Sequence, residues 1–191
     1  QGERTITIQT PVLTVEDGAF IEGSTFGDGD AAAIDIDVQR LVIQNGGHIG
    51  SGTAGEIDLG NGQMWPASTG AGGEITVDAT ESVVLSGDNV NIHDGTSIAT
   101  STQGLGDAGQ ITINSPSIDL GNRATISGFT SSAARGGTII LNTDTLTITG
   151  NAFVTADSGF SDGVDPNSVT GQAGDVVVNA GRVVLNGTGD G

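Results

Sequence analysis

Apolar residues recur along the chain in pairs separated by a single residue, and these pairs come in groups of three. The first group consists of Ile6/Ile8, Leu13/Val15 and Ala19/Ile21. Period-two alternation predicts β-strands, because successive side chains of a strand point to opposite faces. Each group therefore predicts three short strands, here called strand one, strand two and strand three. Equivalent groups begin at Ile34, Ile75, Ile111 and Ile139, and a sixth begins at Val176 with only its first two pairs.

The groups repeat every 28 residues wherever nothing is inserted, as between Ile6 and Ile34. Three insertions interrupt this spacing: eight extra residues within 80–89, thirteen within 50–74 and nine within 155–175. The first of them predicts strand two of the third group at Val90/Ile92. Insertions in a repeat protein of this kind map to surface loops.

Strands this short cannot bury an apolar face alone, but stacked copies can, because each pairs with the copies before and after it. Three strands per copy predict a right-handed, three-sided parallel β-helix of about six rungs, the hand being the one that parallel crossovers adopt. We expect a single domain over 1–191, as a fragment or unit of a longer rod. One interior file should contain Ile6, Ile34, Ile75, Ile111, Ile139 and Val176.

The residue after strand one is polar in all six groups, beginning with Gln9. Asn and Asp tolerate left-handed backbone and bond nearby amides, so this column predicts a corner with a stacked polar ladder. The ladder residues are Asp37, Asp78, Asn114, Asn142 and Asn179. A row of cation ligands is the alternative interpretation. Gly18, Gly46 and Gly95 precede strand three and predict a second corner with positive φ.

The amino-acid composition and the net charge exclude several classes of partner. Five Arg and no Lys stand against 23 acidic residues, for a net charge of −18. Such a surface repels nucleic acid and anionic membranes. Aromatic residues are 3% of the chain, so the core must be aliphatic, and no run is long enough for a membrane helix. There is no Cys, and the chain starts at Gln1 without Met, which indicates a processed or excised piece.

The stretches GDAGQITIN, VEDGAFIEGSTFGDGDA and QAGDVVVNAGRVVLNGTGDG resemble the repeat region of filamentous-haemagglutinin-family exoproteins, especially the large cyanobacterial type. The resemblance covers essentially the whole chain. It implies a secreted β-helix at the bacterial cell surface, often exported by a two-partner system, that serves in adhesion or as a fibrous stalk. The N-P-N-G-type signature of the family's secretion domain does not occur in this sequence.

We therefore expect a structural or adhesive segment of a cell-surface exoprotein that forms a rigid extracellular stalk or fibre and is not an enzyme. Exposed strand edges at both ends favour end-to-end association, and outward Ile140 and Val177 favour lateral contact. Host-cell or matrix carbohydrate is the other candidate partner, whereas nucleic acid and membrane insertion are excluded.

The alternative is a carbohydrate-binding or polysaccharide-cleaving β-helix, with Asp35 and Asp119 as candidate acids. Cleavage needs carboxylates gathered on one face with a base, and no predicted outward face provides that set. His48 and His93 lie at non-equivalent positions without a nearby nucleophile pattern, which favours ordinary surface histidines.

Two further candidates lie in loops. Acidic pairs, Asp28 with Asp30 and Asp162 with Asp165, could bind calcium, although they lack the spacing of known calcium repeats, so no cofactor is expected. The only Met and Trp, Met64 and Trp65, lie in the insertion of the second group. They are the candidate contact with a sugar or partner; the alternative is that Trp65 folds back and covers the rod.

Overall fold

The computed structural model describes residues 4–60, 63–87, 95–159 and 171–187, and these residues contain β-strands and no helix. Each rung starts with a long strand: β1 (Thr5–Val15), β3 (Ala33–Gln44), β7 (Ile75–Ser86), β9 (Gln110–Gly121), β11 (Thr138–Thr149) and β13 (Val176–Asn186). Short strands follow: β2 (Phe20–Glu22), β4 (His48–Gly50), β8 (Ser97–Ala99), β10 (Thr125–Ser127) and β12 (Phe153–Thr155). The insertion of the second group adds β5 (Ile57–Asp58) and β6 (Met64–Trp65).

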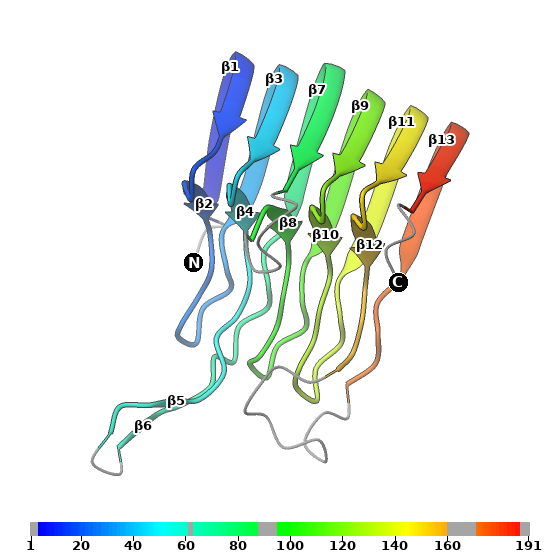
Figure 1. Cartoon of the computed structure of the whole chain (residues 1–191). Coiled ribbons are helices and arrows are strands. Elements are labelled where there is room, and N and C mark those ends of the chain that lie inside the picture. The colour runs from blue at the N-terminus through cyan, green and yellow to red at the C-terminus, as the bar shows by residue number, and fades with distance from the viewer. Residues whose placement is uncertain (1–3, 61–62, 88–94, 160–170, 188–191) are drawn as a thin grey trace.

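The rungs stack in sequence order (Figure 1). The long strands form one six-stranded sheet in the order β1-β3-β7-β9-β11-β13, and the short strands form a five-stranded sheet in the order β12-β10-β8-β4-β2. Every neighbouring pair in these two sheets is parallel. This all-β arrangement with long parallel sheets is consistent with a β-solenoid.

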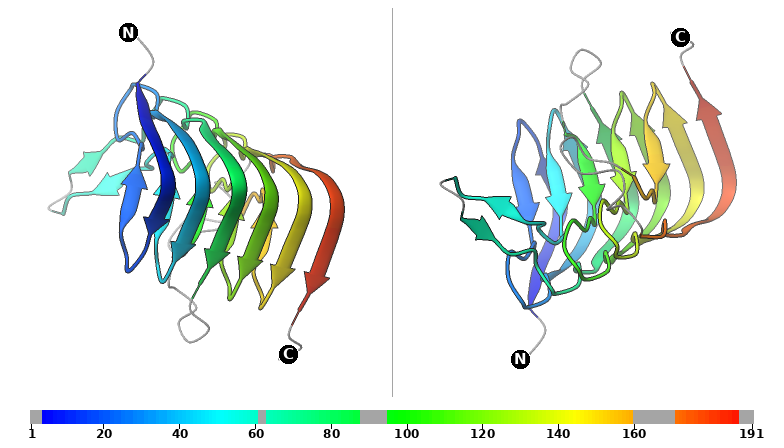
Figure 2. Two further views of the ribbon diagram at one scale, coloured as in Figure 1. Left: turned by 90° about the horizontal axis from the view of Figure 1, so that it is seen from above. Right: turned by 90° about the horizontal axis from the view of Figure 1, so that it is seen from below.

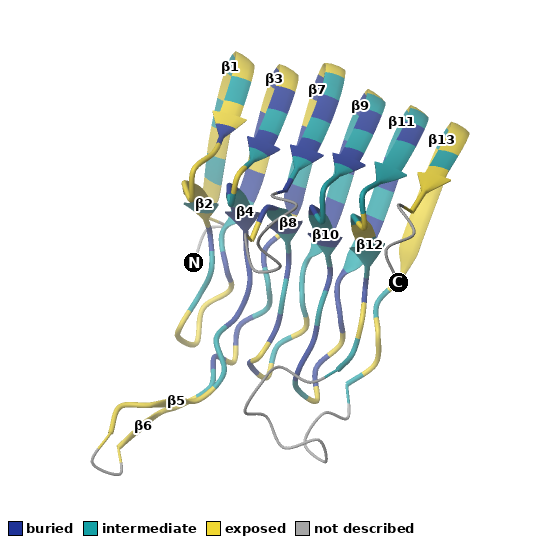
Figure 3. Ribbon diagram, viewed as in Figure 1, coloured by how far each residue is buried: buried dark blue, intermediate teal, exposed yellow. Residues whose placement is uncertain are grey.

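The predicted interior file is confirmed. Successive register partners run from Ile6 to Ile34, Ile75, Ile111, Ile139 and Val176. The middle members of the file have no exposed surface, and the described core is built from aliphatic side chains. Figure 3 shows the burial concentrated in the inner long strands, with β13 and the hairpin exposed.

The prediction of separate strands one and two is wrong, because both lie in a single long strand of each rung. The two apolar pairs are an odd number of residues apart, so the strand must bend to turn both pairs inward. Two successive exposed residues, Gln39 and Arg40, mark the bend in β3. Figure 2 shows the long strands curving as a set. The pairing of β1 with β3 skips Pro11 at the corresponding place, and the pairing of β11 with β13 skips Asp144 and Gly181 there.

The register predicted for the third group is also wrong. Val83 and Leu85 of β7, and not Val90 and Ile92, pair with Leu41 and Ile43 of β3. A shift in register between Val38 and Arg40 accommodates one extra residue of β7. Positions 90 and 92 lie outside the described residues. The segment 82–86 has its own period-two pattern, which competes with the later one.

A third line of parallel contacts runs beside the two sheets as isolated bridges, one per rung. Thr53 and Thr102 of this line are buried, and their Oγ1 atoms are 2.7 Å apart. The line therefore adds a polar stack to an otherwise aliphatic interior. Its members are Thr25, Thr53, Thr102, Thr130 and Ser158.

The corners are only partly as expected. Gly18, Gly46 and Gly95 have φ values of 76°, 81° and 76°, which confirms the left-handed corner before strand three. The polar column after strand one does not occupy a corner with positive φ. Its residues lie inside the long strands, so the left-handed backbone that was inferred for Asp and Asn at these positions is absent there.

Candidate functional site

The polar column forms a hydrogen-bonded ladder along the long sheet. The Asn114 Nδ2 donates to Asp78 Oδ1 at 2.7 Å, and the Asn142 Nδ2 donates to Asn114 Oδ1 at 2.7 Å. The Asn179 Nδ2 continues it to Asn142 Oδ1 at 2.8 Å. All three amides donate toward the amino-terminal rungs. The arrangement is that of a structural ladder, in which each side chain satisfies its neighbour.

Asp37 is the register partner of Asp78, the last acceptor of the ladder. A carboxylate has no N–H, so Asp37 cannot donate to Asp78 as the amides do. Two carboxylates therefore stand at neighbouring positions of adjacent strands. Beside the ladder lies a shallow hollow of about 460 Å³, bordered by Pro116 and Asp144 among others.

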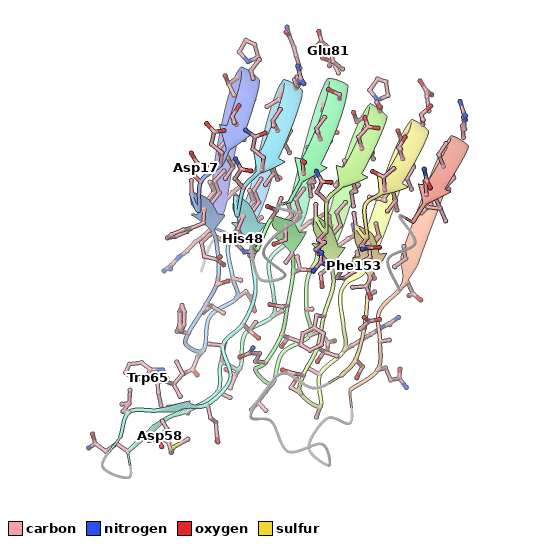
Figure 4. All side chains as sticks on the ribbon, in the orientation of Figure 1. Asp17, His48, Asp58, Trp65, Glu81 and Phe153 are labelled. Carbon is pink, nitrogen blue, oxygen red and sulfur yellow. The ribbon has the colours of Figure 1, made fainter. Side chains whose placement is uncertain are left out.

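A polar row crosses the outward face of the short sheet. The His48 Nδ1 lies 2.8 Å from Ser97 Oγ, and its Nε2 lies 3.4 Å from Glu22 Oε2. The Ser24 hydroxyl donates to the other oxygen of Glu22. Figure 4 shows His48 on this face, among the first rungs. Glu22, His48 and Ser97 come from three successive rungs and were not expected to act together.

The row holds Glu22 in its ionised form. The hydrogen bond from His48 lowers the pKa of the Glu22 carboxyl below its usual value, partial burial opposes this, and the bond from Ser24 adds to the lowering. The Ser97 hydroxyl also lies 2.8 Å from the Gly95 carbonyl oxygen, to which it can donate. The row therefore places a fixed carboxylate, an imidazole and a hydroxyl side by side on the outer face of the short sheet.

Gly50 makes space for this row. A Cβ at Gly50 would lie 2.3 Å from His48 Nε2 and 2.9 Å from Glu22 Oε2. The His48 imidazole and the Glu22 carboxylate thus occupy the space that a side chain at position 50 would fill. Next to them is a hollow of about 320 Å³ whose lining includes Ser24, Phe26 and Ser101.

The hairpin β5–β6 carries Met64 and Trp65, the predicted sugar or partner contacts. Its antiparallel pairs are Ile57 with Trp65 and Asp58 with Met64, so Met64 and Trp65 belong to opposite faces. The two side chains are 53% and 51% exposed, and the Trp65 Nε1 donates to the Phe26 carbonyl at 3.0 Å. Trp65 is therefore both anchored to the first rung and half open to solvent (Figure 4).

The candidate acids for cleavage are not brought together. Asp35 is the register partner of Thr76 on one half of the long sheet, whereas Asp119 is the partner of Val84 on the other half. The Asp119 Oδ2 accepts from Ser117 Oγ at 2.9 Å. The pairing of acid and base that polysaccharide cleavage requires does not arise from these two residues.

The loop carboxylates bond to the protein itself. Asp28 accepts from Thr69 Oγ1 at 3.3 Å, and Asp30 accepts from the Ala71 N–H at 2.9 Å. Asp162, Asp165 and His93 lie outside the described residues. Among the residues that are described, no group of three or more His, Asp or Glu side chains is placed to hold a metal ion.

No family model, curated protein or solved structure matches this chain. The resemblance to filamentous-haemagglutinin-type repeats therefore stays a prediction. Within the described part of the chain, no helix is long and apolar enough to cross a membrane.

The row of Glu22, His48 and Ser97 was missed although its signal is in the sequence. Phe20, His48 and Ser97 occupy one outward column of strand three, and Glu22 follows Phe20 by two residues. Considering each column alone hides the contact, because Glu22 reaches diagonally across Gly50 to the next rung. Such a contact is expected where a small residue such as Gly50 separates two longer polar side chains on neighbouring rungs.

Proposed function

We propose that the chain is a rigid structural segment of an extracellular stalk or fibre of a bacterial surface exoprotein, with no catalytic role. In this proposal it is a right-handed, three-sided β-helix of about six rungs. The observation that carries it is the unbroken parallel ladder from β1 to β13 around one interior file. At about 4.8 Å per strand, six stacked strands give a body roughly 30 Å long.

The outer strands support extension of this body. Along the carboxyl-terminal strand, Val176, Val178 and Leu185 continue the interior files and are 43%, 40% and 71% exposed. The corresponding residues of β3, β7 and β9 are fully buried or nearly so. A further rung, from the same polypeptide or from another copy, would cover them and pair the open backbone edge.

The hairpin β5–β6 supports contact along the rod axis. It projects beyond β1 and β2 in all views (Figures 1 and 2). Ile57, Leu59, Met64 and Trp65 are all exposed on it. A hairpin with two paired positions has little stability of its own, so a neighbouring surface that covers these side chains would stabilise it.

Small-angle scattering over a concentration series, together with negative-stain electron microscopy, tests the proposal. We expect particles that lengthen in steps of about 30 Å at constant cross-section. Val178→Lys places a charge in the interior file and should stop the lengthening. Val177→Lys, at the neighbouring outward position of the same strand, is the matched control and should not. Isometric particles at every concentration, or equal effects of the two variants, would contradict the proposal.

A further inference from the structure

Four of the five aromatic side chains that the structure describes are largely exposed, and the fifth, Phe129, is half-buried. Phe20, Phe26, Phe153 and Trp65 are 72%, 58%, 49% and 51% exposed, and the described core contains no aromatic side chain. Phe and Trp ordinarily supply a large part of a buried core. Six aromatic residues in a chain of 191, with these four on the outside, indicate that they are used for contact with something else.

Two of the exposed aromatics belong to a polar and aromatic strip along the first rung, which we call the rung-one strip and define as Phe20, Glu22, Ser24 and Phe26. The backbone is extended here: residues 20–22 form β2, and Thr25 continues the parallel pairing with Thr53 at the same offset. At about 3.3 Å per residue, Phe20 and Phe26 are up to about 20 Å apart. Glu22 and Ser24 lie between them and are hydrogen-bonded to each other.

The strip borders a real depression. The hollow of about 320 Å³ is lined by Glu22, Ser24 and Phe26 from the first rung and by Gly50 and Gly52 from the second. Ser101 of the third rung also lines it. The glycines remove two side chains from the floor, while the hydrogen bonds to Ser24 and His48 hold the Glu22 carboxylate in one position. The groups facing the hollow are therefore pre-arranged.

We propose that the rung-one strip binds a linear, uncharged saccharide. The apolar C–H face of a pyranose stacks on an exposed aromatic ring, and its hydroxyls donate to a fixed carboxylate and exchange hydrogen bonds with serine hydroxyls. A span of up to about 20 Å between Phe20 and Phe26 accommodates a chain of several sugar units. The net charge of −18 repels polyanions, which selects uncharged glycans over sulfated or uronic-acid chains.

Trp65 supplies a built-in reporter for this site. It is the only Trp of a chain without Tyr, and its indole N–H is bonded to the Phe26 carbonyl. A ligand that contacts Phe26 changes the environment of this indole, so binding should shift the emission of Trp65. The proposal does not depend on whether the rungs extend into a rod, because all of its residues lie on the first three rungs.

The test is affinity electrophoresis of the whole chain through gels containing hydroxyethyl cellulose, laminarin, galactomannan or alginate, with titrations followed by Trp65 fluorescence. We expect retardation by at least one of the three neutral polymers and none by alginate. Phe26→Ala and Phe20→Ala should each weaken binding about tenfold. Glu22→Gln keeps the shape of the side chain and should weaken it about threefold.

Phe153→Ala is the matched control, since Phe153 is an exposed outward residue of the same column at the other end of the short sheet. It should bind like the unaltered chain. Circular dichroism of every variant establishes that the sheets are intact. The proposal fails if no neutral polymer retards the chain, if alginate does so instead, or if folded Phe20→Ala and Phe26→Ala variants bind as well as Phe153→Ala.

Discussion

The two sheets are made by the same repeat, yet neighbouring strands are held together differently in each. In the long sheet, β3, β7 and β9 bury paired apolar residues in both halves, and an amide ladder crosses β9, β11 and β13. A short strand contributes one central apolar residue, such as Ile49 or Ile98. Its outward column changes from Phe20 to His48 and Ser97. Burial is thus concentrated in the long sheet, and the outer face of the short sheet carries the row of Glu22, His48 and Ser97.

The largest effect should come from the interior of the long sheet. Ile111→Ala removes a side chain with no exposed surface and should lower the free energy of unfolding by about 2–4 kcal/mol. Thr112→Ala, at the adjacent outward position, should change it by no more than about 0.5 kcal/mol. Urea titration measures both. An equal loss of unfolding free energy in the two variants would show that the long sheet has no distinct interior face.

A smaller loss is expected from the amide ladder. Asn114→Ala leaves Asp78 without its donor and Asn142 without its acceptor, and should cost about 1–2 kcal/mol. Asn179→Ala breaks a single bond at the outer strand and serves as the comparison, with a smaller loss. The same urea titration applies. A neutral Asn114→Ala would mean that water replaces the ladder without cost.

The ladder can also be lengthened. Asp37→Asn supplies an amide next to Asp78 and removes one of two neighbouring negative charges, so it should raise stability by about 0.5–1 kcal/mol. Asp35→Asn, two residues away on the same strand, removes equal charge without joining the ladder. Thermal unfolding of the two variants separates the effects. A gain of equal size from Asp35→Asn would attribute the stabilisation to net charge alone.

The smallest effect should be the pH response of the short sheet. The folded-state pKa of Glu22 is lowered, so its contribution is present above the unfolded-state pKa near 4.5 and is lost as pH falls through the folded value. Glu22→Gln should therefore lose a little stability at neutral pH and converge with the unaltered chain in acid. Melting temperatures measured across this range check it. Parallel pH profiles would show that the His48 pairing contributes nothing.

Much of the fold was accessible from the sequence because the repeat is strict. Ile6, Ile34 and Ile75 mark the interior file, and each fits only an inward position. The third group was misplaced because Val83/Leu85 and Val90/Ile92 have the same alternation. Only the neighbouring strands, which pair with Val83, distinguish them.

The candidate site was harder to predict from the sequence. A side-chain contact between two rungs depends on the polar residues that form it and also on a small neighbour, such as Gly50, that leaves room for it. Trp65 was singled out by its rarity, and the structure does place it half exposed. The partnership of Glu22 with His48 depends on Gly50, whose importance is visible only when a Cβ is placed there. The buried Thr53–Thr102 contact was also missed, although Thr25 and Thr53 are separated by the repeat length of 28 residues, because a single polar residue in a loop shows no period-two alternation.

The one-way direction of the amide ladder has a consequence for chemical ageing. Asn both donates and accepts, whereas Asp only accepts, so an Asp can end the ladder but cannot stand within it. Deamidation of Asn114 would turn an internal link into a second carboxylate facing Asp78, and the damage would sever the ladder between β7 and β9. The same lesion at Asn179 would spare every bond on the amino-terminal side of Asn142. Loss of the Asn114 amide would therefore interrupt the ladder where it meets the acidic rungs, whereas loss of the Asn179 amide would remove only its last bond.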